Sequence, residues 1–449
     1  MNNISEENSI TLDTFRYNCA GNVPAIVSKS YAHRYIILAA LAKVPSRIIC
    51  KGTSKDIEAT IGCMNSLGAD IRRDGDALII NPISYDRASN EESESIDVGE
   101  SGSTLRFMLP VIGALGRNVS ITMHGRLPER PLSPLYEEME EHNVSMSEQG
   151  CNPFHISGQM TSGDYTIAGN ISSQFITGLL MSLPLLDGDS RIIVTGKMES
   201  RPYIDITLDV LRKMGITITE EAGTFIIKGG QIPVVSEDFV VEGDWSNAAF
   251  FLCLGAMGKK PVTVSGLNPL SEQGDRKILD ILNRFGAFVS IIPDDDKTSS
   301  VTVSPGALKG IDIDAADIPD LVPIISAVAA IADGTTTIRN IARLRIKESD
   351  RVQTVIDTLS KLGADIREVK TVDDSTNIKD DNDNKSYLEI RGKKSLSGGT
   401  VDSHNDHRIA MTAAILSAVS EGPVTINNCR AVEKSYPNFY EELSSLCKF

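Results

Sequence analysis

The chain has 449 residues, of which 41% are hydrophobic, and its formal net charge at pH 7 is −16. A chain of this length exceeds the size at which one hydrophobic core normally stops growing, so we expect two domains. The acidic balance disfavours nucleic-acid binding, which depends on clustered lysine and arginine. The polar start shows no targeting pattern, and no apolar run reaches the roughly 18 residues of a membrane span. We therefore expect a soluble, cytoplasmic protein.

The seven cysteines are scattered along the chain, at positions 19, 50, 63, 151, 253, 429 and 447. They form no CxxC pair and no cluster with histidine. This spacing argues against a disulfide framework and against a zinc site. We predict reduced thiols, and a reaction that needs no metal and no organic cofactor.

Followed from the N-terminus, one structural unit recurs six times. Each copy is an apolar helix rich in alanine and leucine, then a short β-rich run and a turn, as in Ser-Arg-Ile-Ile-Val-Thr-Gly at 190–196. The copies occupy residues 31–52, 103–125, 172–196, 246–266, 320–340 and 407–427.

A second element alternates with the first. It is an amphipathic helix that ends near a glycine and is followed by two strands, which suits a left-handed helix cap and a hairpin. It occurs at residues 63–80, 210–228, 281–303 and 358–390, and more faintly at 136–156. The acidic, polar residues 370–385 are predicted to be an exposed insertion.

Small, hydroxylic and cationic residues stand where the apolar helices begin. The free N–H groups and the positive dipole end of a helix N-terminus attract anions. Serine and aspartate there are also ordinary N-caps, and capping explains any single copy. The recurrence favours anion binding. The helix starts are Lys29-Ser30 with Arg34, Gly102 with Arg106, Ser172-Ser173-Gln174, Asp244 to Asn247, Pro319-Asp320 and Asn405 to Arg408.

At these positions the chain resembles the EPSP synthase branch of the enolpyruvyl transferase family along nearly its whole length. Ten strings in the right order carry the resemblance. They are SKSYAHR (28–34), SGSTLR (101–106), RLPERP (126–131), SSQF (172–175), SRPYIDIT (200–207), EGDWSNAAFFL (242–252), IPDLVP (318–323), RIKESDR (345–351), NDHRIAM (405–411) and EKSYPNFYEEL (433–443).

The resemblance implies an α/β fold of two similar domains, each made of three βαβαββ repeats around inner parallel helices, an inside-out α/β barrel. Residues 1–26 and 244–449 would form domain I, with the phosphoenolpyruvate side and the catalytic carboxylates. Residues 27–243 would form domain II, on the shikimate 3-phosphate side. The chain would cross between the domains near 25–28 and 242–246, with the substrates between them.

The resemblance also implies the reaction. The enolpyruvyl group of phosphoenolpyruvate would move to the 5-hydroxyl of shikimate 3-phosphate by addition and elimination, with release of phosphate, in the shikimate pathway of aromatic amino-acid biosynthesis. Glu348 would protonate C3 of phosphoenolpyruvate and later remove a methyl proton, and Asp320 would accept the hydroxyl proton. Lys29 would contact both substrates. Without the resemblance, we would interpret the segment RIKESDR (345–351) as a solvated, charged helix start.

The remaining site residues follow from the matched strings, and arginine suits both carboxylate and phosphate because its planar fork donates in pairs. Gly102 lacks a Cβ, which lets a ligand approach the backbone. His407 is expected to be a site neighbour only. The expected shikimate 3-phosphate contacts are Lys29, Ser30, Arg34, Ser172, Ser173, Gln174, Ser200, Tyr203, Asp320, Arg343 and Lys347. The expected phosphoenolpyruvate contacts are Lys29, Gly102, Arg130, Gln174, Arg351, Arg408 and Lys434.

Three positions depart from the family pattern: Glu100 and Phe107 replace a common Asn and Pro, and Arg343 replaces a frequent Asn. We place Phe107 in the first turn of its helix, where proline would fix φ. Phenylalanine would then let Gly102 move toward the ligand, and we expect reduced sensitivity to glyphosate, the family's inhibitor. The alternative is that Phe107 packs into the core and leaves Gly102 unmoved.

Other functions remain as alternatives. The related UDP-N-acetylglucosamine enolpyruvyl transferase carries an essential cysteine between its second and third repeats, whereas residues 116–129 contain none. An RNA 3'-phosphate cyclase-like enzyme would call for a basic surface. A silent binding scaffold would not need Lys29, Asp320 and Glu348 together. We expect a monomer whose partners are two small-molecule substrates, with no nucleic acid and no membrane.

Overall fold

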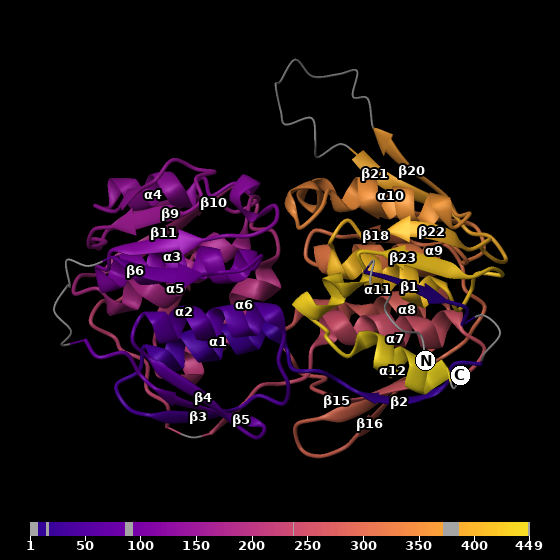
Figure 1. The fold of residues 1–449 in the computed structure, drawn as a ribbon, viewed down its shortest axis with the longest axis horizontal. Helices are drawn as coiled ribbons and strands as arrows, with labels where there is room; N and C mark the ends of the chain where they lie inside the picture. The colour runs from indigo at the N-terminus through magenta and orange to yellow at the C-terminus, as the bar shows by residue number, and fades with distance from the viewer. Residues whose placement is uncertain (1–7, 15–17, 86–92, 237, 371–385, 448–449) are drawn as a thin grey trace. The chain divides into compact units, whose positions relative to one another are not determined.

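The computed structural model describes residues 8–14, 18–85, 93–236, 238–370 and 386–447 (Figure 1). The chain divides into two compact units. Unit 1 comprises Met1–Ile26 and Gly243–Phe449, and unit 2 comprises Val27–Glu242. Each unit contains three sheets, and the described strands form six separate sheets in all.

The sheets of unit 2 share one strand arrangement, in which two parallel strands are extended by an antiparallel hairpin, and in the second and third sheets the parallel strands are joined through a helix. The first sheet has the order β14 (Phe239–Val240), β3 (Ser46–Ile49), β5 (Ala77–Asn81), β4 (Asp70–Asp74), with helices α1 (Lys29–Ala40) and α2 (Lys55–Ser66). The second is β6 (Glu94–Asp97), β7 (Val119–Thr122), β9 (Phe154–Ser157), β8 (Ser145–Met146), with α3 (Gly102–Leu115) and α4 (Leu135–Glu141). The third is β10 (Asp164–Ala168), β11 (Ser190–Thr195), β13 (Thr224–Ile227), β12 (Ile218–Glu221), with α5 (Ser173–Ser182) and α6 (Arg201–Lys213).

Unit 1 follows the same plan, except that its last sheet has three strands. The first sheet has the order β2 (Gly21–Pro24), β15 (Val262–Leu267), β17 (Ser299–Ser304), β16 (Phe288–Pro293), with α7 (Trp245–Met257) and α8 (Ile278–Phe285). The second is β18 (Asp312–Asp314), β19 (Thr335–Arg339), β21 (Ser386–Arg391), β20 (Asp365–Lys370), with α9 (Val322–Ala329) and α10 (Arg351–Lys361). The third is β22 (Gly399–Asp402), β23 (Val424–Asn427), β1 (Ser9–Leu12), with α11 (His407–Leu416) and α12 (Phe439–Cys447).

Strands β2 and β14 each pair within one unit, but the helix that follows each strand in the sequence belongs to the other unit. Strand β2 pairs in parallel with β15 of unit 1, but the helix that follows β2 is α1 of unit 2. Strand β14 pairs in parallel with β3 of unit 2, but the helix that follows it is α7 of unit 1. The chain therefore passes between the units twice, after residues 26 and 242.

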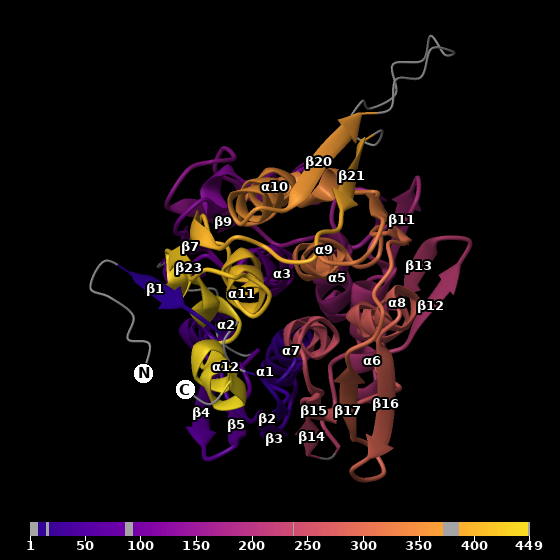
Figure 2. The ribbon, with the colours of Figure 1, turned by 90° about the vertical axis from the view of Figure 1, so that its right-hand side faces the viewer.

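The six apolar helices form the interiors of the two units: α1, α3 and α5 in unit 2, and α7, α9 and α11 in unit 1. In α7, every residue except Ser246 is buried, and α9 is buried throughout. A helix that is hydrophobic on all sides must be surrounded by protein. Figure 2 shows α7, α9 and α11 packed together inside unit 1, while the amphipathic α8 and α10 each bury only one face. The prediction of two α/β domains with inner helices and paired hairpins is confirmed.

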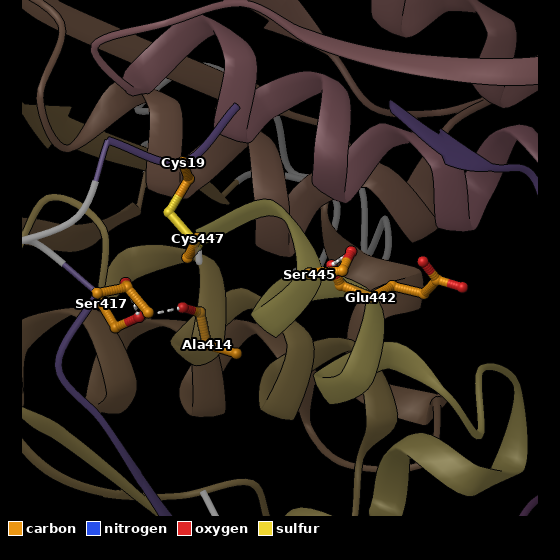
Figure 3. The surroundings of a disulfide bond; sticks show 7 residues. Cys19, Ala414, Ser417, Glu442, Ser445 and Cys447 are labelled. Carbon is orange, nitrogen blue, oxygen red and sulfur yellow. Dashed lines mark hydrogen bonds between the residues drawn. A yellow bond between two sulfur atoms is a disulfide. The ribbon is translucent and has the colours of Figure 1, made fainter. Parts of the chain in front are cut away.

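The prediction against disulfides is wrong at one pair. Cys19, between β1 and β2, is bonded to Cys447 at the end of α12 (Figure 3). The two residues are 428 positions apart and both are buried. The backbone N–H of Ala20 also donates to the carbonyl of Leu446 at 3.0 Å. Only the folding of the N-terminal segment onto α12 brings these cysteines together, so sequence spacing could not show it.

The other five cysteines are unpaired, and all but Cys151 are buried. Most of the predicted insertion, residues 371–385, lies outside the described residues. Across the described ranges, no helix combines the length and the apolarity that crossing a membrane demands.

Candidate active site

Lys29 is the first residue of α1, and Ser28 before it is the N-cap that accepts the backbone N–H of Tyr31. The Lys29 ammonium donates to Asp56 Oδ2 at 2.7 Å, and the side chains are 18% and 11% exposed respectively. Asp56 lies in the first turn of α2. Sequence reasoning missed it, because an acidic residue in a first helical turn is ordinary.

Arg34 lies one turn further along α1 and is 2% exposed. Its guanidinium donates to the hydroxyls of Thr207 (2.8 Å) and Thr177 (3.3 Å) and to the carbonyls of Ser30 (2.6 Å) and Tyr203 (2.9 Å). Burial lowers the pKa of Arg34 to about 10, against opposing contributions from Tyr31 and Tyr203. The group is therefore still charged at neutral pH. Ser30, Arg34 and Tyr203, predicted separately, are brought together.

The start of α3 gathers two arginines and a glutamine. A Cβ on Gly102 would lie against Nη1 of Arg130 and Nη1 of Arg106, so a side chain at this position would displace the two guanidinium groups. Arg106 Nη1 donates to Gln174 Oε1 at 3.1 Å, and Gln174 Nε2 donates to Ser103 Oγ at 2.8 Å. Gly102, Arg130 and Gln174 thus form one group, as the predicted phosphoenolpyruvate contacts require.

The other predicted residues of unit 2 lie at two further helix starts. Ser172 is the N-cap of α5 and accepts the backbone N–H of Gln174 at 3.3 Å, and Ser173 is buried. Ser200 precedes α6 with a φ of 54°, in the left-handed region, and is 1% exposed. Serine rarely adopts this conformation, and such residues concentrate at functional sites.

In unit 1, Arg351 is the centre of a network of carboxylates. This side chain is 1% exposed and begins α10. It donates from Nε to Asp406 Oδ2 at 2.8 Å, from Nη1 to Asp320 Oδ1 at 2.7 Å, and from Nη2 to Glu348. Burial disfavours its charge, but Asp406, Glu348 and Asp320 hold the pKa of Arg351 well above the usual value. The network joins both predicted proton-transfer residues.

Two further cations reach Asp320. Arg408 on α11 donates from Nη2 to Asp320 Oδ2 at 3.1 Å, and Lys347 Nζ is 3.7 Å from Asp320 Oδ1. Burial, reinforced by Arg343 and Arg351 and opposed by Asp320 and Glu348, lowers the pKa of Lys347 to about 8. Lys347 is thus the charge in this network that changes within an accessible pH range.

The remaining predicted residues of unit 1 lie at its helix starts. Lys434, in the 3-10 helix Cys429–Lys434, donates to the carbonyl of Asn405 at 2.6 Å, beside the start of α11. Arg343 lies in the 3-10 helix Ala342–Ile346, just before Lys347. His407 is the first residue of α11 and is 1% exposed.

Three potential metal ligands, on Glu348, Asp406 and His407, lie within 4.8 Å of one another. Arg351 donates to both carboxylates, so its guanidinium already supplies the positive charge that a metal ion would bring. This cluster fits an orienting role for the carboxylates better than metal binding.

The EPSP synthase (3-phosphoshikimate 1-carboxyvinyltransferase) family model matches residues 16–443. The chain belongs to the EPSP synthase family. It is 41% identical over 430 residues to the 3-phosphoshikimate 1-carboxyvinyltransferase of Clostridium kluyveri, covering 95% of each chain. It is 42% identical over 428 residues to that of Clostridium perfringens, covering 95% of this chain and 96% of the relative. The EPSP synthase structure from Acinetobacter baumannii has the same fold, with a TM-score of 0.77, 23% identity and 98% of both chains covered.

Asp275 is a buried acid that the EPSP synthase resemblance did not lead us to expect. It lies in the 3-10 helix Gly274–Lys277, is 3% exposed, and accepts a hydrogen bond from Ser246. Burial, with the nearby Asp320 and against Arg408, raises the pKa of Asp275 to about 7. No motif marks it, because its significance comes only from its tertiary neighbours.

Phe107, where EPSP synthases commonly have proline, is not in the first turn of α3, as we had predicted. The helix begins at Gly102, so Phe107 is its sixth residue and lies in the second turn. The ring is 2% exposed, with the ring of His33 at 6.1 Å and the Arg34 guanidinium at 5.2 Å from its centroid. The Phe107 side chain therefore packs in the core, as the alternative prediction stated. Its assignment to the first turn is corrected by the N-cap, Ser101, from which the turns of α3 are counted.

One cavity of about 530 Å³ in unit 2 contains none of the predicted residues. It lies beyond the C-terminal ends of α3 and α5, and its lining includes Leu115, Arg117, Gln159 and Leu186. Gly102 and Gln174 lie at the opposite, N-terminal ends of α3 and α5. This cavity is therefore separate from the candidate site of the enzyme family.

Proposed function

We propose that this protein transfers the enolpyruvyl group of phosphoenolpyruvate to the 5-hydroxyl of shikimate 3-phosphate and releases phosphate. The observation that carries the proposal is the network around Arg351, which holds the side chains of Asp320 and Glu348 from one guanidinium. An addition followed by an elimination needs an acid and a base that are separately positioned. Membership of the EPSP synthase family supplies the substrates.

The proposed chemistry begins with Glu348, which protonates C3 of phosphoenolpyruvate and makes C2 electrophilic. Asp320 accepts the proton of the 5-hydroxyl as its oxygen attacks C2. Elimination then reverses the first step: Glu348 removes a proton from the new methyl group while the C2–O bond to phosphate breaks. Lys29 donates a proton to the departing phosphate. The proton taken up by Asp320 then returns to Lys29 through solvent, so the enzyme is regenerated and the sum is enolpyruvyl transfer plus free phosphate.

Most of the proposed anion contacts lie at or beside the N-termini of helices, where N–H groups and the helix dipole favour anions, whereas Arg130 and Lys434 lie at the C-terminal ends of 3-10 helices. For shikimate 3-phosphate they are Lys29, Ser30, Arg34, Ser172, Ser173, Gln174, Ser200 and Tyr203 of unit 2 and Asp320, Arg343 and Lys347 of unit 1. For phosphoenolpyruvate they are Lys29, Gly102, Arg130 and Gln174 of unit 2 and Arg351, Arg408 and Lys434 of unit 1.

We further propose a monomeric, cytoplasmic enzyme without metal, organic cofactor or nucleic-acid partner. The formal charge of −16 opposes nonspecific nucleic-acid binding. Five unpaired cysteines fit a reducing compartment, whereas the Cys19–Cys447 disulfide does not. The guanidinium of Arg351 among the carboxylates supports a reaction without a metal.

The test is phosphate release by the purified protein with both substrates, against controls that omit each one. UDP-N-acetylglucosamine in place of shikimate 3-phosphate tests the nearest alternative. We expect release only with phosphoenolpyruvate and shikimate 3-phosphate together. Activity with the nucleotide sugar instead would overturn the assignment. Loss of activity on exhaustive chelation, restored by one divalent metal, would overturn the metal-free reaction.

A further inference from the structure

A chain of buried hydrogen bonds joins α1, α2 and α3 in unit 2. Nδ1 of His33 on α1 is 2.7 Å from Oγ1 of Thr60 on α2. Thr60 Oγ1 is 2.8 Å from Oγ1 of Thr104 on α3, and Thr104 donates its hydroxyl to Ser101 Oγ at 2.8 Å. Ser101 is the N-cap of α3 and directly precedes Gly102. This series of hydrogen bonds thus ends at Ser101, next to the candidate phosphoenolpyruvate contact Gly102.

Each member of this chain is almost fully buried: His33 and Ser101 are 1% exposed, and Thr60 and Thr104 are 0% exposed. Burial, assisted by the positive charge of Lys29 and Arg34, holds the pKa of His33 well below its usual value. The ring is therefore neutral and carries one proton. Nε2 has no hydrogen-bond partner among the described residues, so we place this proton on Nδ1, which donates it to Thr60.

The order of donors along the chain then follows. A hydroxyl has only one proton to give, so Thr60 accepts from His33 and donates onward. Thr104 donates its hydroxyl to Ser101 Oγ, which also accepts the backbone N–H of Thr104 at 3.2 Å. The N-cap oxygen is therefore held by two hydrogen bonds from Thr104, and these fix the first turn of α3.

Asp56 connects this series of hydrogen bonds to Lys29, the proposed proton donor. The main-chain oxygen of Asp56 lies 3.4 Å from Thr60 Oγ1 and 3.5 Å from Thr104 Oγ1. Its carboxylate accepts from Lys29 at 2.7 Å. One residue of α2 therefore contacts both the ammonium at the start of α1 and the hydroxyl near the start of α3.

We propose that His33, Thr60 and Thr104 are positioning residues that set the start of α3 relative to Lys29 and so determine the binding of phosphoenolpyruvate. The inference rests on the proposed function, in which Lys29 and Gly102 are contacts of that substrate. Displacing a reacting group by about 1 Å can cost about 100-fold in rate, so small shifts of a helix start matter.

Disrupting this series of hydrogen bonds should weaken the binding of phosphoenolpyruvate more than that of shikimate 3-phosphate. Arg34, a proposed contact of shikimate 3-phosphate, is held by a different set of partners, which includes Thr177, Thr207 and the carbonyl of Tyr203. Losing a hydroxyl from the chain leaves those bonds intact. A purely structural role would instead lower stability and leave the two Michaelis constants of the folded enzyme unchanged.

The experiment compares Thr60→Val with Thr60→Ser. Valine has the shape of threonine without the hydroxyl, whereas serine keeps the hydroxyl. We expect Thr60→Val to raise the KM for phosphoenolpyruvate about 10-fold, the effect of one lost buried hydrogen bond, and to change the KM for shikimate 3-phosphate less than about twofold. Thr60→Ser should stay within about twofold of the unaltered protein for both. Melting temperatures establish that each variant is folded.

Thr104→Val, with Thr104→Ser as its control, is the second test should Thr60→Val fail to fold. It should show the same substrate-selective rise, and the double valine variant should show less than the product of the two effects, because both act on one chain. Unchanged constants in a folded valine variant, or equal rises for both substrates, would overturn the inference. If the unaltered protein releases no phosphate, the proposed function itself fails, which is a different outcome.

Discussion

The buried arginines of the two units have different hydrogen-bond partners. Arg34 of unit 2 donates only to hydroxyls and main-chain carbonyls among the described residues. Arg351 of unit 1 donates to three carboxylates. Both are almost fully buried, at 2% and 1% exposed. Burial lowers the pKa of Arg34, whereas in Arg351 the three carboxylates outweigh burial and raise the pKa, so the difference between the two arginines comes from their partners.

This difference suits two tasks. A cation that is satisfied by neutral acceptors keeps its field and attracts an anionic ligand. A cation shared among carboxylates instead fixes the orientation of those carboxylates, which proton transfer requires. Under the proposed function, we expect Arg34 of unit 2 to serve substrate binding and Arg351 of unit 1 to orient the groups that transfer protons. The following predictions test this contrast.

The largest effect is expected at the carboxylates. Asp320→Ala and Glu348→Gln should each reduce turnover by about 10²- to 10⁴-fold, the usual contribution of general acid–base catalysis, with a smaller change in substrate binding. Phosphate-release kinetics and calorimetric binding measure the two quantities. Asp280→Asn, at an exposed position of α8, is the matched control. Near-normal turnover in either variant removes that residue from the mechanism.

The second prediction compares the two arginines directly. Arg351→Met should lower the free energy of unfolding by about 3–5 kcal/mol, because it leaves buried carboxylates without their cation. Arg34→Met should cost only about 1–2 kcal/mol, since neutral acceptors lose less when one donor is removed. Denaturant titration of both variants provides the measurement. Equal losses would show that the partners of the two arginines do not matter.

The third prediction concerns the disulfide, which unit 1 contains and the described part of unit 2 does not. Reduction of Cys19–Cys447 should lower the free energy of unfolding by about 2–4 kcal/mol, because it releases a covalent constraint on the unfolded chain. Thermal unfolding with and without dithiothreitol measures the change. Cys447→Ser is the control and should be insensitive to the reductant. If it responds as strongly as the unaltered protein, the effect comes from other cysteines.

The fourth prediction uses the pH dependence of Lys347. Its pKa of about 8 means that the ammonium is charged below pH 8 and loses its proton above it, whereas Arg34, at about 10, stays charged. The KM for shikimate 3-phosphate should therefore rise above pH 8 by up to about tenfold per pH unit, as a step distinct from any change near pH 7 that the charge of Asp275 causes. Steady-state kinetics between pH 6.5 and about 9.5 measure it. Lys347→Arg should remove the rise, and a rise that persists must come from another group.

The smallest effect is expected at Phe107. Proline there would remove a hydrogen bond in the second turn of α3 at a cost of about 3 kcal/mol, so Phe107→Leu is a cleaner test than Phe107→Pro. Because the ring packs in the core beside Arg34, a proposed contact of shikimate 3-phosphate, losing it should change glyphosate sensitivity and the KM for phosphoenolpyruvate less than about twofold. Inhibition curves at a fixed ratio of phosphoenolpyruvate to KM measure the effect. Markedly stronger inhibition would mean that the ring governs the helix start.

Local sequence patterns predicted much of the fold. The six helix-and-strand copies and most of the hairpins lie where apolar periodicity and turn residues placed them, because such patterns act over a few residues. The helix starts at Lys29, Gly102 and Ser172 were also predicted, and each lies at or directly after the serine that caps its helix. The start of α3 at Gly102 was predicted, but Phe107, the sixth residue of the helix, was placed in its first turn and lies in its second.

Only the tertiary structure decided which distant residues meet. Asp406 and Asp320 converge on Arg351 across 55 and 31 positions, and Cys19 meets Cys447 across 428. Asp275 and Asp56 carry no signal in their own segments. The sequence by itself determined where helices begin and which of them are buried, because burial and capping are written in local composition. The ionisation of Arg34 and Arg351 depends on partners from other segments, because charge interactions are set by distance in space and not by distance along the chain.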